Sequence, residues 1–158
     1  MKKLFIILIS LMGLSACNQP REKTNMHEGM QMNQTVPACC VKDGIFIHIS
    51  SGYDNPHKAL MPLKMAMMMA KDKDVILYLD IEAVKMVLKD SKDMKFADFP
   101  PLKELLKHLI DAKITIMACP ACLKIAGKTG DDLMPGVIVA EKEKFFNFTK
   151  GRIITLDY

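Results

Sequence analysis

The sequence predicts an α/β domain in which about five mostly parallel strands are covered by helices on both faces. Short β-branched apolar runs alternate with helix-forming segments from residue 44 to residue 158. The runs are apolar at successive positions, as in strands that a parallel sheet buries on both faces. Cys119 closes the third run, at the carboxyl end of a strand, where parallel sheets place their ligands.

Each expected element has a local signal of its own. The segment 56–71 is long and rich in helix formers, and 101–112 carries leucines at helical spacing. Gly127 or Gly130 is expected to end the helix that follows the third strand. The expected strands are 44–50, 74–80, 113–119, 136–140 and 152–158, and the other expected helices are 82–90, 120–128 and 141–150.

Pro62 lies inside the first expected helix. A proline in a helix interior removes a backbone hydrogen bond and clashes with the preceding turn. We therefore expect this helix to begin late, between Lys58 and Met61, so that Pro62 falls in its first turn. The alternative is a helix that kinks at Pro62.

The amino-terminal residues predict export. Lys2 and Lys3 precede an apolar segment that is too short to span a bilayer, which is typical of a signal peptide. The letters LSAC that end at Cys17 resemble a bacterial lipobox, and this resemblance implies cleavage before Cys17 and a lipid on that cysteine. Asn18 rather than aspartate follows, which implies the outer membrane where the cell has two. We expect an exported protein that faces the periplasm or the cell exterior, anchored to a membrane without spanning it.

The predicted organisation is a signal peptide (1–16), a lipidated flexible tether (17–42) and one domain (43–158). The tether is polar and lacks an apolar period. The chain has 22 basic and 18 acidic residues, and no basic cluster is interleaved with aromatic residues. A nucleic-acid partner is therefore not expected.

The stretch MACPACLK contains the main candidate site. Pro120 suits the first position of a helix, so Cys119 is expected at the N-cap and Cys122 in the first turn. Free N–H groups and the positive end of the helix dipole favour a thiolate there. The same spacing suits a reactive disulfide, two thiolate ligands for a soft metal, or two cysteines that only brace the fold.

Two segments, HISSGYDNPHKALMPLKMAMMMA and LKELLKHLIDAKITIMACPACLKIAGKTGDDLMPGVIV, resemble the DsrE/DsrF-like family over residues 44–158. The matching features are a strand that ends in cysteine before a short helix, a following DLMPGV segment and a Pro-His loop after the first strand. The resemblance implies a flavodoxin-like three-layer α/β/α sandwich, a trimer or hexamer, and a cysteine that carries a persulfide between partners. By position this cysteine is Cys119, and Cys122 matches a cysteine that only some members have.

His57 is a third candidate for the site. It follows Asn55 and Pro56 in the loop after the first strand, within expected reach of Cys119 across adjacent strand ends. It would orient or deprotonate the thiol as in a Cys–His pair. The alternative is a histidine at a helix start that packs or contacts solvent. His48, in the middle of the first strand, is expected to be a hydrogen-bonded core residue.

These observations predict a thiol-based sulfur (persulfide) carrier or a thiol/disulfide redox protein. Cys119 would attack and Cys122 would resolve, and the partner would be a sulfur-donor or thiol protein. The expected homo-oligomer, a trimer or hexamer, rests on the family resemblance.

The alternative function is a non-catalytic module that binds copper(I) or zinc, because soft ligands gather in the tether. A third possibility is an assembly protein whose cysteines only brace the fold. No cofactor is expected apart from such a metal. The candidate metal ligands are Cys119, Cys122, Cys39, Cys40, Met26, His27, Met30 and Met32.

Overall fold

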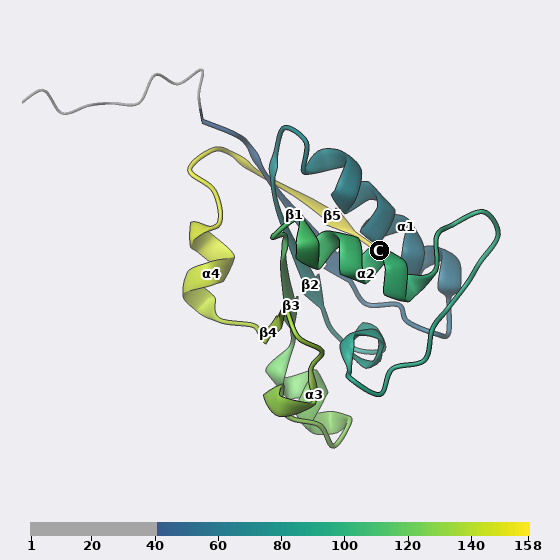
Figure 1. Ribbon diagram of the computed structural model, residues 1–158. Helices are drawn as coiled ribbons and strands as arrows, with labels where there is room; N and C mark the ends of the chain where they lie inside the picture. The colour runs from purple at the N-terminus through teal and green to yellow at the C-terminus, as the bar shows by residue number, and fades with distance from the viewer. Residues whose placement is uncertain (1–40) are drawn as a thin grey trace, which may run out of the picture. The chain divides into compact units, whose positions relative to one another are not determined.

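The computed structural model describes residues 41–158, and Figure 1 shows how their helices and strands are arranged. The predicted signal peptide, Cys17 and the tether ligands from Met26 to Cys40 lie outside the described residues. Among residues 41–158, no helix has the length and apolar character that crossing a membrane requires.

A five-stranded sheet organises the described residues. Its strand order is β4-β3-β2-β1-β5, and every pair of neighbours is parallel. Each strand lies inside one of the five predicted apolar runs, so the predicted parallel α/β fold is confirmed. The strands are β1 (Gly44–Ile49), β2 (Asp74–Leu79), β3 (Thr115–Ala118), β4 (Val137–Val139) and β5 (Ile153–Asp157).

Helical segments connect the strands, as parallel pairing requires. The short helix expected over 82–90 forms as a 3-10 helix and is shorter than expected, over Ala83–Val87. It ends where Leu88 turns to an extended conformation and bridges Leu133. The helical segments are α1 (Pro56–Met69), η2 (Ala83–Val87), α2 (Leu102–Asp111), α3 (Pro120–Ile125), η3 (Gly130–Asp132) and α4 (Lys142–Asn147).

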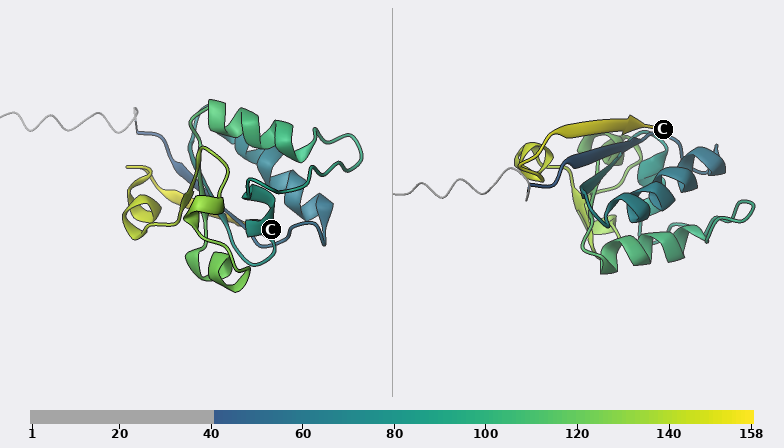
Figure 2. Two further views of the ribbon diagram at one scale, coloured as in Figure 1. Left: turned by 60° about the horizontal axis from the view of Figure 1, so that its bottom comes forward. Right: turned by 90° about the horizontal axis from the view of Figure 1, so that it is seen from above.

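The helices cover both faces of the sheet, as Figures 1 and 2 show. On one face, Ile47 of β1 is fully buried in the same hydrophobic cluster as Leu63 of α1 and Leu109 of α2. Because side chains alternate along a strand, Phe46 points to the other face. Its ring lies 5.0 Å from that of Phe145 in α4, measured between centroids. The sheet is thus the middle of three layers.

Helix α1 begins earlier than expected. The Oδ1 of Asn55 accepts a hydrogen bond from the N–H of Lys58 over 3.2 Å, which caps the helix. Pro56 occupies the first turn, where a missing N–H costs nothing. Pro62 is consequently inside the helix and buried. The expected late start was wrong because the cap and the buried apolar face outweigh the one hydrogen bond that Pro62 removes.

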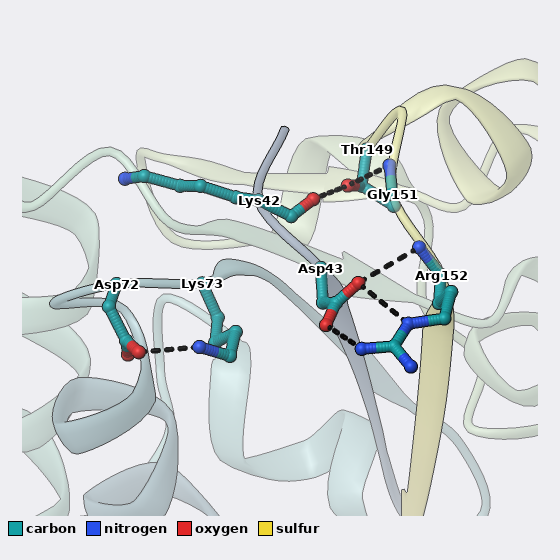
Figure 3. A network of polar contacts seen from close by, with 7 residues as sticks. All are labelled: Lys42, Asp43, Asp72, Lys73, Thr149, Gly151 and Arg152. Atoms are coloured by element: carbon teal, nitrogen blue, oxygen red, sulfur yellow. Dashed lines mark hydrogen bonds and ion pairs between the residues drawn. The ribbon is translucent and has the colours of Figure 1, made fainter. Parts of the chain in front are cut away.

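Polar contacts fasten the edge strand β5 to β1 at their amino ends (Figure 3). The guanidinium of Arg152 donates to both carboxylate oxygens of Asp43, over 2.7 and 3.2 Å. The Thr149 hydroxyl donates to the carbonyl of Lys42 over 2.9 Å, and the N–H of Gly151 donates to the same hydroxyl oxygen. This network lies at the opposite end of the sheet from Cys119, which follows the carboxyl end of β3.

Candidate functional site

Cys119 lies at the junction of β3 and α3, as the sequence predicted. Its N–H donates to the carbonyl of Leu79 over 2.9 Å, which extends the β2–β3 pairing one residue beyond the strand. Pro120 then opens α3, and the N–H of the buried Leu123 donates to the carbonyl of Cys119 over 3.0 Å. The sheet and the helix therefore fix the backbone on both sides of this thiol.

Cys122 lies in the first turn of α3, beside the turn that follows β2. The N–H of Ile81 donates to its Sγ over 3.2 Å. Ile81 has a φ of 45°, in the left-handed region that a β-branched residue rarely adopts. Cys119 and Cys122 are both free thiols, and both are partly exposed. A strained turn thus supplies a hydrogen-bond donor to one member of a reduced pair.

The surroundings of Cys119 favour its thiolate. Burial by itself raises the pKa of this thiol, but hydrogen bonds from the Tyr78 hydroxyl and from Cys122 outweigh burial, with a further contribution from the N–H of Ala121. The pKa of Cys119 therefore lies below its ordinary value. Because the thiolate is the nucleophilic form of cysteine, these surroundings favour nucleophilic attack by Cys119.

The pKa of Cys122 is shifted in the opposite direction from that of Cys119. Burial raises the pKa of its thiol, and the hydrogen bond to Cys119 together with the negative charges of Cys119 and Asp80 raises it further, against the lowering effect of the Ile81 N–H. Cys122 consequently keeps its proton and donates it toward the Cys119 thiolate. When neighbouring groups have pKa values pushed apart in this way, their chemical roles differ.

Tyr78 of β2 is the side-chain donor to Cys119. It pairs in register with Met117, so it shares a face of the sheet with Cys119, two residues further along. Its ring centroid lies 4.9 Å from that of Phe145 and 5.6 Å from that of His48. Burial raises the pKa of Tyr78, and the hydrogen bond to Cys119 raises it further. The phenol therefore keeps its proton and remains a donor.

A histidine between two carboxylates lies on the same face. The Nε2 of His48 is 2.9 Å from the Oδ2 of Asp80, and its Nδ1 is 2.5 Å from the Oδ1 of Asp157. The Nε2 contact is an ion-pair distance rather than a well-aligned hydrogen bond, and the Oδ1 of Asp80 is buried with no hydrogen-bond partner among the described residues. His48 is thus half-buried against carboxylates that follow or end strands β2 and β5.

An apolar hollow of about 230 Å³ opens beside Cys122. Ile81 and Ile125 are 60% and 86% exposed there, and an ion pair of 2.6 Å between Lys85 and Glu82 borders it. A compound that approaches the thiol pair from this side meets exposed branched side chains. The lining residues are Ile81, Glu82, Lys85, Cys122, Ile125 and Ala126.

His57 has aromatic neighbours. It is the second residue of α1, and its ring centroid lies 5.4 Å from that of Phe96 and 5.6 Å from that of Phe99. These contacts fit the alternative interpretation of His57, a histidine at a helix start that packs against its neighbours. The structure thus brings Cys119 together with Cys122, and the role of His57 beside Cys119 stays a prediction.

The metal hypothesis depends on residues outside the described part of the chain. Of its candidate ligands, only Cys119 and Cys122 belong to residues 41–158. Within that range, no three histidine, cysteine or acidic side chains are placed to hold a metal ion. Copper(I) or zinc binding therefore stays a prediction about the tether.

Sequence reasoning assigned no role to Tyr78 or Asp80 and described His48 as a core residue. The signal that could have found them is the period of two within β2. Tyr78 and Asp80 alternate with buried leucines, and the register with β3 places them on the face of Cys119. That register is not readable from one sequence.

The fold and the site define a flavodoxin-like α/β protein with a thiol pair at a strand end. The chain belongs to the DsrE/DsrF-like family, whose sequence profile matches residues 18–154.

Two solved structures show the same fold. The ychN protein from E.coli is 18% identical, with a TM-score of 0.58 over 72% of this chain and 99% of that chain. MTH1491 from Methanobacterium thermoautotrophicum is 18% identical, with a TM-score of 0.52 over 73% of this chain and 100% of that chain. No curated protein matches the chain. The predicted flavodoxin-like sandwich is confirmed.

Proposed function

We propose that this protein exchanges sulfur through Cys119, whose thiolate attacks a sulfur–sulfur bond in a partner disulfide or persulfide. The observation that carries the proposal is the placement of Cys119 at the start of α3, with a second free thiol, Cys122, one turn away. The surroundings agree with it, because they lower the pKa of Cys119 and raise that of Cys122. A thiolate beside a thiol that keeps its proton suits a nucleophile with a resolving partner. Membership of the DsrE/DsrF-like family supports a sulfur-relay type of fold.

With a disulfide partner, the Cys119 thiolate bonds to one partner sulfur, and the other leaves with the bonding electron pair and takes up a proton. Cys122 then loses its proton and attacks the Sγ of Cys119, which expels the first partner sulfur as a second thiolate. Cys119 and Cys122 are oxidised to a disulfide, and the partner disulfide is reduced to two thiols.

With a persulfide donor, the Cys119 thiolate bonds to the outer sulfur and the donor leaves as a thiolate. The Cys119 persulfide then gives that outer sulfur to an acceptor thiolate, and no net oxidation occurs. Family membership favours this version. The raised pKa of Cys122 slows its competing attack on the persulfide, an attack that would release sulfide and close a disulfide.

Trapping experiments test the proposal. The protein is treated separately with inorganic polysulfide and with dithiodipyridine, quenched in acid and weighed intact by mass spectrometry. In a Cys39→Ser/Cys40→Ser background, we expect Cys122→Ser to accumulate one added sulfur or one pyridylthio group on Cys119, whereas Cys119→Ser reacts no faster than an ordinary thiol. Equal uptake by the two variants at neutral pH would overturn the proposal.

The proposal also includes a location outside the cytoplasm and a homo-oligomeric state. The lipobox-like letters before Cys17 support a lipid anchor, and the family resemblance supports a trimer or hexamer. Labelling of growing cells with a tagged fatty acid should mark the wild-type protein and not Cys17→Ala. Light scattering on the soluble domain measures the assembly, and a monomer at micromolar concentration would contradict that part.

A further inference from the structure

We propose that Asp80 is the general base that takes the proton of Cys122 when this thiol resolves the Cys119 adduct, and that His48 positions it. The inference rests on the proposed function, because it concerns the second step of the same exchange. It assigns a role to a carboxylate that the attack by Cys119 does not need.

The backbone places Asp80 between two contacts with the cysteine segment. The residue before it, Leu79, accepts the N–H of Cys119 over 2.9 Å. The residue after it, Ile81, donates its N–H to the Sγ of Cys122 over 3.2 Å. Asp80 also shares a face of the sheet with Tyr78 and Cys119. Its carboxylate charge raises the pKa of both Tyr78 and Cys122, as expected for a close neighbour.

His48 lies at ion-pair distance from one carboxylate oxygen of Asp80, and the other oxygen has no hydrogen-bond donor among residues 41–158. The Oδ2 lies 2.9 Å from the Nε2 of His48, whose Nδ1 lies 2.5 Å from Asp157 on the neighbouring strand. The Oδ1 is buried, and no donor among residues 41–158 reaches it. A buried acceptor without a donor is unfavourable and rare, and a catalytic role is one accepted reason for it. In the resting protein Cys122 donates toward Cys119, so this lone pair becomes the acceptor for the Cys122 proton, directly or through one water, after Cys119 has formed the adduct.

The second step of the exchange requires a base, because Cys122 must lose its proton before it can attack. Cys122 keeps its proton in the resting protein, yet only its thiolate can attack the Sγ of Cys119. In the proposed step the Asp80 carboxylate accepts the Cys122 proton, directly or through one water, as the new sulfur–sulfur bond forms. The bond between Cys119 and the partner sulfur breaks, and the partner leaves as a thiolate that takes the proton back.

Other titratable groups lie around Asp80 and Cys122, and they make different contacts. His48 of β1 lies against the Oδ2 of Asp80, and Asp157 of β5 contacts the opposite ring nitrogen of His48. Tyr78 hydrogen-bonds Cys119 and not Asp80. His48 thus acts through Asp80 and is a positioning residue.

A two-phase reaction with dithiodipyridine tests the inference. In a Cys39→Ser/Cys40→Ser background, the first thiopyridone is released when Cys119 attacks the probe, and the second is released when Cys122 attacks the Cys119 adduct. We expect Asp80→Asn to leave the first phase unchanged and to slow the second about a hundredfold at neutral pH, at the low end of general-base effects. The defect should fade as pH rises, because Cys122 then ionises without a base.

The sign of the effect separates the two possible roles of Asp80. If its charge only repels the Cys122 thiolate, Asp80→Asn will lower the pKa of Cys122 and make the second phase faster. A second phase that is faster or unchanged, after a normal first phase, would overturn the inference and leave the proposed function standing. A missing first phase in the wild type would overturn both.

Three variants complete the design. Asp74→Asn is the matched control, because Asp74 begins β2 and Asp80 follows its last residue, six positions on, and both phases should keep their wild-type rates. Asp80→Glu should recover part of the second-phase rate by restoring a carboxylate. His48→Gln should slow the second phase less than Asp80→Asn does, and an unchanged second phase would remove His48 from the inference.

Discussion

The backbone N–H of Ile81 donates to the Sγ of Cys122 over 3.2 Å, from a turn in which Ile81 has a φ of 45°. The left-handed conformation costs an ordinary residue about 1–2 kcal/mol, and Ile81 recovers little through burial because its side chain is 60% exposed. The turn that aims a donor at the resolving thiol is therefore maintained against local strain.

Replacing Ile81 with glycine should relieve this strain. Ile81→Gly is expected to raise the free energy of unfolding by up to about 1 kcal/mol, since glycine adopts positive φ freely and little apolar contact is lost. Urea unfolding measures the change. Ile125→Gly is the matched control, because Ile125 is even more exposed but is the last residue of α3, where glycine relieves no strain and should cost up to about 1 kcal/mol. A loss of stability in both variants would contradict the assignment of strain to Ile81.

The Tyr78 hydroxyl should control the reactivity of Cys119. Burial raises the pKa of Cys119 and the Tyr78 hydrogen bond lowers it, so Tyr78→Phe removes the largest lowering contribution. We expect the pKa of Cys119 to rise and its alkylation by iodoacetamide at neutral pH to slow about three- to tenfold, as for a rise of up to about one pKa unit. The measurement is the pH profile of the alkylation rate in the Cys122→Ser background.

The control for Tyr78→Phe is Tyr53→Phe. The Tyr53 hydroxyl donates to the carbonyl of Lys92 over 2.6 Å and not to a cysteine. Its removal should leave the alkylation profile unchanged. Identical profiles for wild type and Tyr78→Phe would show that the phenol does not stabilise the thiolate.

Gly52 couples the loop after β1 to the turn that carries Ile81. A Cβ at Gly52 would lie 2.6 Å from the carbonyl oxygen of Glu82, so the backbone of the turn must shift. Gly52→Ala should therefore lower the free energy of unfolding by about 1–3 kcal/mol, as overpacking does. It should also weaken the Ile81 donor to Cys122, and the pKa of Cys122 should rise because this hydrogen bond lowers it.

Two measurements follow Gly52→Ala. Urea unfolding gives the stability, and alkylation of Cys122 in the Cys119→Ser background gives its reactivity at each pH. Ser51→Ala, at the neighbouring half-buried position of the same loop, should change neither quantity by much. An unchanged free energy of unfolding in Gly52→Ala would contradict the prediction, because it would mean that the backbone at Glu82 can shift without destabilising the fold.

The sequence predicted the strands better than the surroundings of the thiols. The five apolar runs and the strand end at Cys119 are local features, so one sequence contains them. The donor role of Tyr78 depends on the register between β2 and β3, and the contact of His48 with Asp157 depends on β5 returning beside β1. Such pairings join residues far apart in the chain, and no local pattern encodes them.

The start of α1 was predicted wrongly although its signal was local. Asn55 followed by Pro56 is a capping residue followed by a first-turn proline, and the expected clash at Pro62 was given more weight than this cap. His57 was expected beside Cys119 on the adjacency of strand ends alone. Its contacts with Phe96 and Phe99 come from the loop before α2, whose path the sequence pattern does not predict.

The ion pair at the amino end of β5 should make stability depend on pH. A hydrogen bond from Arg152 lowers the pKa of Asp43 below its ordinary value of 3.8 in the folded protein. The ordinary pKa applies to Asp43 in the unfolded chain. The contribution of the ion pair to the free energy of unfolding is therefore fully present above that pKa, and it is lost as pH falls through the lower pKa of the folded protein.

Arg152→Gln should consequently lower the urea midpoint at neutral pH, and the difference from wild type should shrink as the solution is acidified below about pH 4, where the unfolded chain binds its proton. The effect is small because the Arg152 side chain is 85% exposed and solvent screens the pair. Lys150→Gln removes a nearby positive charge that forms no ion pair among residues 41–158, and its difference from wild type should not change across this pH range. A difference for Arg152→Gln that stays constant down to pH 2 would show that Arg152 acts through packing of β5 rather than through the charge of Asp43.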